Sequence, residues 1–273
     1  MKNVQLFSYL WYDISVTVHG ILEMEVNMIQ TAIVTGASGS IGGAIAAQLA
    51  KAGYSIVLTG NESKASLEET LHLCQDEAMQ KKTTLHTLCG DLSNAVTAGD
   101  LIKEAAHLLG HVDILVNCAG ISHIGLLSDM TDSEWQKVVN TNLSSAFYCC
   151  RSVIPSMVHQ KSGRILNISS VWGNVGASCE VAYSAAKGGL NAFTKALAKE
   201  LAPSGIAVNA LACGMIDTPM NHCFSQEEIN AICEEIPSGR MGTPEEVAEL
   251  TCLLAKAPVY MTGQILTMDG GWF

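Results

Sequence analysis

The chain has 273 residues, 48% of them hydrophobic, and its 15 Lys and Arg against 26 Asp and Glu give a formal net charge of −11. This length suffices for one large α/β domain, and no stretch rich in Pro, Ser or Gly divides it. The acidic balance, without any block of Lys or Arg, argues against nucleic acid or an anionic membrane as a partner.

The ten cysteines lie mostly within apolar segments. They lack the paired spacing of a zinc site or of a small disulfide scaffold. We therefore expect reduced thiols, a cytoplasmic location and no metal ion.

Residues 1–27 do not follow the pattern of the rest of the chain. They contain one Lys, and they lack the apolar core and the small-residue cleavage site of a signal peptide as well as the apolar length of a membrane span. We expect a poorly ordered extension, or a start codon upstream of the physiological one. The predicted domain covers residues 28–273 and begins at Met28 or Ile29.

From residue 29 onward, short apolar runs alternate with segments of helical periodicity. Strands are predicted at 29–35, 55–59, 84–89, 112–117, 164–169, 206–212 and 264–268, and helices at 41–52, 67–80, 98–109, from 131 along an apolar stripe to 157, at 183–201 and from 243. Thr131 and Glu134 form a capping box at the start of the long helix, and Asn142 interrupts its stripe. Such alternation predicts an α/β fold of the Rossmann type, a doubly wound parallel sheet in a single domain.

A glycine-rich turn, Thr35–Gly42, connects the first predicted strand to the first predicted helix. Glycines there let the backbone approach a pyrophosphate, and the helix N-terminus adds free N–H groups and a positive dipole end. A glycine cluster alone is more often a tight turn, but the strand before it and the helix after it predict a dinucleotide site. The expected contacts come from Gly36, Ser38, Gly39, Ser40, Ile41 and Gly42.

Tyr183 and Lys187 are four residues apart on a predicted helix, so their side chains share one face. An unperturbed Tyr titrates near pKa ~10 and is a poor acid or base at neutral pH, unless a nearby positive charge favours its phenolate. Lys187 supplies such a charge, and Ser170 lies thirteen residues before Tyr183. Each residue alone has an ordinary structural explanation, but together they indicate a nicotinamide-dependent carbonyl reductase.

Taken in order, the motifs resemble those of the short-chain dehydrogenase/reductase family. They are Thr35–Gly42, Asn117–Gly120, Asn142, Ser170, Tyr183 with Lys187, and Gly214–Thr218. The family turn usually reads Thr-Gly-x-x-x-Gly-x-Gly, whereas Ser40 here replaces the middle glycine. Cys213 replaces a usual Pro, and Cys118 replaces a usual Asn; we expect both to be inert buried thiols, with a redox sensor as the alternative.

The resemblance implies a role for each catalytic position. Tyr183 would protonate the carbonyl oxygen, Ser170 would hydrogen-bond it, and Lys187 would depress the Tyr pKa and hold the nicotinamide ribose. Asn142 would hold a water in the proton relay. Further cofactor contacts are implied for Asp91 and Leu92 at the adenine, for Asn117, Ala119 and Gly120, and for Ile216 and Thr218 at the carboxamide.

Cofactor choice is determined after the second strand, where NAD enzymes commonly place an acid on the ribose 2′-hydroxyl. Gly60 occupies that position here, Asn61 stands where many NADP-dependent relatives have Arg, and Lys64 is a phosphate partner. These residues favour NADP(H) over NAD(H). Glu62 argues for NAD(H) instead, since a shift of one residue in the alignment with the family would place an acid at the ribose position again.

The segments 240–248 and 260–264 resemble the bacterial 3-oxoacyl-[acyl-carrier-protein] reductases, which makes a carrier-bound ketone the leading substrate. The acidic carrier would then dock on a local patch around Lys161, Arg164 and Lys199.

The segment 171–181 is similar instead to a branch that reduces the 5-aminopentanone group on elongation factor P. In that branch Glu180 would meet a cationic amine; otherwise it caps the following helix or faces water. Another small-molecule ketone is a further alternative.

A non-catalytic nucleotide-binding scaffold or sensor is the alternative of another class, against which the intact catalytic set argues. The resemblance also implies a homotetramer. The apolar stripe on 132–157 and that of Leu190, Phe193, Leu197 and Leu201 agree with pairing of helices, although a wholly intramolecular core would also explain them.

Overall fold

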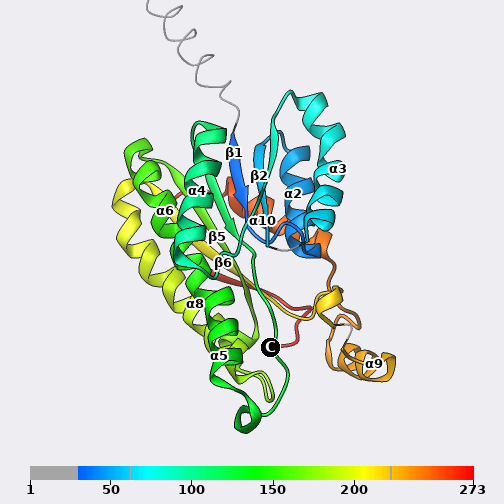
Figure 1. Cartoon of the computed structure of the whole chain (residues 1–273). Coiled ribbons are helices and arrows are strands. Elements are labelled where there is room, and N and C mark those ends of the chain that lie inside the picture. Colours follow the sequence, from blue (N-terminus) through cyan, green and yellow to red (C-terminus); the bar gives the residue numbers. More distant parts are fainter. Residues whose placement is uncertain (1–29, 62, 222) are drawn as a thin grey trace, which may run out of the picture. The chain divides into compact units, whose positions relative to one another are not determined.

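The computed structural model describes residues 30–61, 63–221 and 223–273 (Figure 1). The expectations for residues 1–27, for the start of the domain at Met28 or Ile29 and for Glu62 lie outside these residues. Residues 31–273 form one compact unit, and the description below concerns that unit.

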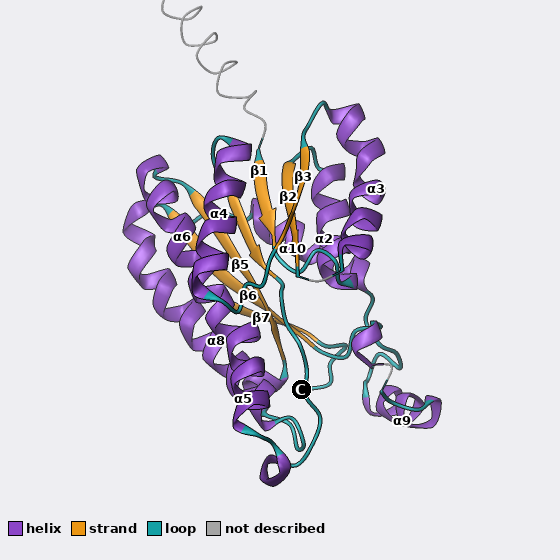
Figure 2. Ribbon diagram, viewed as in Figure 1, coloured by secondary structure: helices purple, strands orange, loops and turns teal. Residues whose placement is uncertain are grey.

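Seven parallel strands form one sheet in the order β3-β2-β1-β4-β5-β6-β7 (Figure 2). The strands are β1 (Thr31–Val34), β2 (Ser55–Gly60), β3 (Leu85–Cys89), β4 (Ile114–Asn117), β5 (Gly163–Ser170), β6 (Ile206–Cys213) and β7 (Ile265–Met268). The order reverses between β1 and β4, which pair in parallel with Ile33 opposite Leu115. The predicted doubly wound α/β fold is therefore confirmed.

Helices cover both faces of the sheet. They are α2 (Ser40–Lys51), α3 (Lys64–Lys81), α4 (Ala95–Leu109), α5 (Asp132–Val139), α6 (Ser145–Gln160), α7 (Trp172–Val175), α8 (Val181–Leu201), α9 (Gln226–Glu235) and α10 (Pro244–Lys256). One apolar core joins α2, α3 and α10 to the sheet, and the other joins α4, α6 and α8. Alternate strand residues supply the two cores: Ala32 and Val34 pack into the first, and Ile33 into the second. No helix within the described ranges is long and apolar enough to cross a bilayer.

The long helix expected from Thr131 to Met157 is two helices. A π-helical segment, η2 (Asn140–Ser144), separates α5 from α6. The predicted capping box is present, since Thr131 accepts from the Glu134 N–H and the Glu134 carboxylate accepts from the Thr131 N–H. Trp135 and Phe147, both expected on the buried stripe, are 38% and 41% exposed. The extra residue of the π turn changes the residue spacing along the helix, so one continuous stripe does not describe both helices.

Two helices were not predicted from the sequence, the short α7 and the ten-residue α9. The start of α9 does carry a readable signal, because Ser225 and Glu228 form a complete capping box. Three short 3₁₀ segments complete the described part of the chain: η1 (Leu127–Asp129), η3 (Ala202–Ser204) and η4 (Pro219–Asn221).

A chain of buried polar side chains connects β4, β5 and α8. The Asn117 amide donates to Asn167 Oδ1 at 2.9 Å, and the Asn167 amide donates to Thr194 Oγ1 at 2.8 Å. Thr194 in turn donates to the Leu190 carbonyl at 2.8 Å. Asn167 is fully buried, so its two bonds hold the sheet and the helix in one register.

Replacing Asn167 by Ala leaves the Asn117 amide and Thr194 without their buried partner. We expect the free energy of unfolding to fall by about 2 kcal/mol, measured by urea denaturation. Asn230→Ala on α9 is the matched control, because Asn230 is exposed and bonds only Gln226; we expect its effect to stay below about 0.5 kcal/mol. Equal effects in the two variants would contradict a structural role for the buried chain of amides.

Candidate active site

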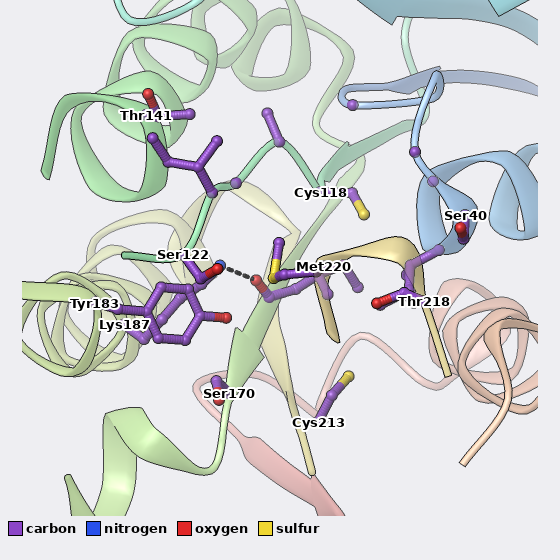
Figure 3. Close-up of a pocket in the computed structure, with 18 of the residues that line it drawn as sticks. Ser40, Cys118, Ser122, Thr141, Ser170, Tyr183, Lys187, Cys213, Thr218 and Met220 are labelled. Carbon is purple, nitrogen blue, oxygen red and sulfur yellow. Dashed lines mark hydrogen bonds between the residues drawn. The ribbon is translucent and has the colours of Figure 1, made fainter. Parts of the chain in front are cut away.

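A cavity of about 1170 Å³ opens at the carboxyl ends of the strands. It lies where the sheet order reverses between β1 and β4, the usual ligand position in open α/β sheets. Its lining runs from the glycine turn through the ends of β2, β4, β5 and β6 to η4 and α9 (Figure 3). The volume exceeds that of a typical small-molecule pocket, so the cavity has room for a dinucleotide together with a substrate.

The glycine turn is shaped by contacts that exclude larger residues. Gly36 has φ +65°, and a Cβ there would lie 2.8 Å from Cα of Ala119. A Cβ on Gly42 would overlap the Gly36 carbonyl group, its carbon being 2.7 Å away. Gly39 precedes α2 without any side-chain cap, so the first N–H groups of that helix stay available to a ligand. Ser40, in the position of a usual family glycine, begins α2 without a positive φ and costs no strain.

Thr35 fixes this turn to the next strand of the sheet. Its Oγ1 accepts from the backbone N–H of Cys118 at 3.0 Å and of Ala119 at 3.2 Å. The motif predicted no separate role for Thr35, yet its hydroxyl joins the two segments that form the floor of the cavity.

Ser170, Tyr183 and Lys187 converge on the same cavity from β5 and α8 (Figure 3). Ser170 ends its strand, and its Oγ accepts from the Trp172 N–H at 3.2 Å. Lys187 is 4% exposed, its Nζ donates to the Ile168 carbonyl at 2.8 Å, and it lies 5.6 Å from the Tyr183 ring centroid. The predicted trio is therefore brought together in space.

Burial dominates the electrostatics of this trio. It raises the pKa of Tyr183 above its ordinary value, against the opposing effect of a hydrogen bond with Ser170. It lowers the pKa of Lys187 to about 8. The expected depression of the Tyr183 pKa by Lys187 is not what this structure gives, because the ammonium is directed at the Ile168 carbonyl and the phenol is desolvated.

Two expected site residues lie behind the cavity wall. Both amide N–H groups of Asn142 are used, in bonds to the carbonyls of Ile121 at 2.8 Å and of Val138 at 2.9 Å. Asn117 belongs to the buried chain of amides described above. Neither side chain lines the cavity, so their effect on it is to position the backbone: Asn142 ties the π turn to the segment after Gly120, and Asn117 holds the end of β4.

The other expected cofactor residues line the cavity directly. They are Gly36, Ser38, Gly39, Ser40, Ile41, Gly42, Asn61, Asp91, Leu92, Ala119, Gly120, Ile216 and Thr218. The lining also includes Ser63, Ser66, Trp172 and Trp272, which the sequence analysis did not single out. The turn admits only glycine at its tight positions, the start of α2 is uncapped, and the walls beyond are apolar. These features fit a nicotinamide dinucleotide.

The thiols of Cys118 and Cys213 also face the cavity (Figure 3). Burial raises the pKa of each to about 12, so both are protonated at neutral pH. This agrees with inert thiols rather than reactive ones. Within the residues that the structure describes, no group of three or more His, Cys, Asp or Glu side chains is placed to hold a metal ion.

Comparison with known proteins identifies the family. A family model described as short chain dehydrogenase matches residues 30–229. The chain belongs to the short-chain dehydrogenase/reductase family. The resemblance stated from the motifs is thereby confirmed, and the protein is an oxidoreductase of a family that binds nicotinamide cofactors.

Relatives in this family match over nearly their whole length. The uncharacterized oxidoreductase YmfI of Bacillus subtilis is 42% identical over 246 residues, which are 90% of this chain and 99% of the relative. The 3-oxoacyl-[acyl-carrier-protein] reductase FabG of Aquifex aeolicus is 37% identical, covering 89% of this chain and 97% of its own. A crystal structure assigned to a short-chain alcohol dehydrogenase from Sinorhizobium meliloti has a TM-score of 0.84 at 33% identity, covering 90% of this chain and 97% of that one.

Gly42→Ala tests the cradle of this short-chain dehydrogenase/reductase. The added methyl group overlaps the Gly36 carbonyl, so we expect the turn to open and the affinity for NADPH to fall at least about tenfold, measured by fluorescence titration. Gly99→Ala is the control, because a Cβ there meets only Ser152 Oγ at 3.7 Å. Unchanged affinity in a folded Gly42→Ala variant would rule out close backbone contact with the cofactor.

Proposed function

We propose that this short-chain dehydrogenase/reductase reduces a ketone to a secondary alcohol with NADPH. The observation that carries the proposal is the convergence of Tyr183, Ser170 and Lys187 on a cavity whose other end is the glycine cradle. A bound reduced nicotinamide supplies a hydride to the carbonyl carbon. The chain itself supplies the site for the carbonyl oxygen and the proton that this oxygen takes up.

The raised pKa of Tyr183 suits the direction of reduction. A phenol that keeps its proton at neutral pH is ready to donate it to the carbonyl oxygen. Ser170 Oγ, already oriented by the Trp172 N–H, donates a second hydrogen bond to the same oxygen. Lys187, with a pKa of about 8, carries its charge at pH 7 and stabilises the phenolate that remains after proton transfer.

The preference for NADP(H) is supported by the side chains beyond β2. Ser38, Asn61, Ser63 and Ser66 line that end of the cavity, and all are neutral hydrogen-bonding groups. Ser63 also caps α3, accepting from the Ser66 N–H, and the positive dipole end of this 18-residue helix favours a phosphate. A ribose 2′-phosphate fits this chemistry better than a bare hydroxyl does.

Asn61→Asp places a carboxylate where the 2′-phosphate is expected. Like charges repel, and a carboxylate accepts from a ribose 2′-hydroxyl, so we expect the ratio of kcat/KM for NADPH over NADH to fall at least about tenfold. Asn230→Asp on α9 adds the same charge at an exposed site away from the cavity and serves as the control. A ratio that changes equally in both variants would contradict the assignment of Asn61 to the 2′ position.

For the substrate, we propose a 3-oxoacyl-[acyl-carrier-protein], because relatives 37% identical over nearly the full chain carry that name. The basic patch expected to dock the carrier does not border the cavity. Lys161 precedes β5 whereas Ser170 ends it. At ~3.3 Å per residue the two lie roughly 25–30 Å apart, at opposite ends of this strand. Arg164 is half-buried and donates to the Ala257 carbonyl at 2.9 Å. A carrier seated on this patch would reach the cavity only through its long prosthetic arm or across a subunit boundary.

A second candidate, reduction of the aminoketone group on elongation factor P, is favoured by Glu180. Its side chain makes no capping bond to α8, although it occupies the N-cap position. Instead it lines the cavity together with Trp172, and burial raises its pKa. A partly buried carboxylate next to an indole suits a cationic amine better than it suits an acyl chain.

The proposed homotetramer rests on apolar side chains left at the surface of α5 and α6. Trp135 and Phe147 are 38% and 41% exposed, and Val158 is 40% exposed. These are the residues that a second copy would cover.

Oxidation of NADPH, followed at 340 nm with acetoacetyl-carrier protein, tests the leading substrate. We expect turnover that Tyr183→Phe lowers by about 10²–10⁴-fold, because the proton donor is removed, while the dissociation constant for NADPH stays unchanged.

The same assay with aminoketone-modified elongation factor P separates the two candidates. Turnover of the modified factor alone, lowered in Glu180→Gln, would replace the carrier substrate by the second candidate. Tight cofactor binding with no ketone turned over, and no effect of Tyr183→Phe on any function, would indicate a non-catalytic nucleotide-binding protein instead.

A further inference from the structure

Three aromatic rings stand together at the substrate end of the cavity. The Trp172 centroid is 5.2 Å from Trp272 at an interplanar angle of 61° and 5.3 Å from Phe273 at 62°. Trp272 and Phe273 are 4.8 Å apart. These separations and tilts are the favourable arrangement of aromatic pairs. Trp172 and Trp272 both line the cavity, so the cluster forms part of its wall.

Trp172 places this wall beside the carbonyl site. Its backbone N–H donates to Ser170 Oγ at 3.2 Å, the hydroxyl assigned above to the carbonyl oxygen. Its ring packs against Trp272 and Phe273, so the wall is continuous from Ser170 to the end of the chain. A ketone whose oxygen reaches Ser170 and Tyr183 therefore has one substituent close to the Trp172 ring.

Trp272 is held against Trp172 by the backbone that carries it. The carboxylate of Asp269 accepts from the Gly271 N–H at 2.9 Å with one oxygen and from the Phe273 N–H at 2.9 Å with the other. Gly270 and Gly271 have φ +69° and +88°, a sharp bend that other residues resist.

This bend also packs against the segment that follows α9. The Gly270 carbonyl accepts from the Ser238 N–H at 3.1 Å. A Cβ on Gly270 would lie 2.8 Å from Cγ2 of Ile236, so only glycine fits. The backbone of residues 269–273 is thus fixed both by the hydrogen bonds of the Asp269 turn and by its packing on the segment after α9.

We propose that Trp272 is a specificity-determining residue that limits the size of the ketone substituent pointing away from the nicotinamide. This inference rests on the proposed ketone reduction. A ring fixed by a packed neighbour and by the Asp269 turn cannot yield to a bulky group without breaking several contacts at once. Phe273, which is 57% exposed, supports the Trp272 ring from the solvent side.

The test compares two ketones that share a reacting group and differ in bulk, ethyl acetoacetate and ethyl 3-oxo-3-phenylpropanoate. In Trp272→Ala we expect the ratio of kcat/KM, phenyl ketone over methyl ketone, to rise at least about tenfold, with NADPH affinity unchanged. Tyr260→Ala is the matched control, because Tyr260 is fully exposed and does not line the cavity; it is expected to leave the ratio as in the wild type.

An unchanged ratio in a folded Trp272→Ala protein, with its melting temperature checked by circular dichroism, overturns the inference. If that variant does not fold, Trp272→Leu is used, and the same rise supports the inference while its absence overturns it. If the wild type reduces neither ketone, the proposed activity on small ketones is contradicted, and this result says nothing about the role of Trp272. Calorimetric titration of the phenyl ketone into NADPH-loaded protein then decides about Trp272: at least tenfold tighter binding in the variant supports its role, and equal binding overturns it.

Discussion

The site depends on how closely the ends of two neighbouring strands approach each other. Thr35 after β1 accepts two backbone hydrogen bonds from the segment after β4, and Gly36 is pressed against Ala119 of that segment. Without this contact the glycine turn would have no fixed height above the sheet, and the start of α2 would have no fixed direction. The segments after β1 and β4 therefore form one rigid floor, on which the dinucleotide cradle and the catalytic trio share a cavity.

Burial of Lys187 is the second constraint, and it affects more than its own charge. An ammonium that is 4% exposed needs a buried acceptor, which the Ile168 carbonyl provides from within β5. The bond ties α8 to the strand that ends in Ser170, so the hydroxyl and the phenol keep their spacing. Gly173 of α7 packs closely on the same part of α8, because a Cβ there would lie 2.7 Å from the Lys187 backbone. Burial lowers the pKa of Lys187, and its bond to Ile168 aligns Ser170 and Tyr183 at the cavity.

Sequence patterns predicted the sheet well and the cavity wall only in part. The strands and the glycine turn were readable because short apolar runs and clustered glycines are local properties of the chain. The catalytic trio was readable because the spacing of Tyr183 and Lys187 is fixed by one helix. Asn142 was expected to hold a water of the proton relay and Asn117 to contact the cofactor, yet the positions of both side chains behind the wall depend on neighbours far away in the sequence. Trp272 was missed for the same reason, since its partner Trp172 lies a hundred residues earlier.

The π-helical turn at Asn140–Ser144 shows how one residue can set the phase of a whole helix. An α-helix advances about 100° per residue, so an extra residue in a regular helix would rotate everything before it by that angle relative to everything after it, whereas the wider π turn accommodates the residue and keeps the two helices in phase. With the insertion, Val138 of α5 and Ala146 of α6 both face inward while Asn142 between them reaches the backbone of Ile121. In a regular helix the eight steps from Val138 to Ala146 would amount to about 800°, so Ala146 would point about 80° away from Val138. In this stretch the irregular geometry, rather than the ideal helix, is the form compatible with the fold.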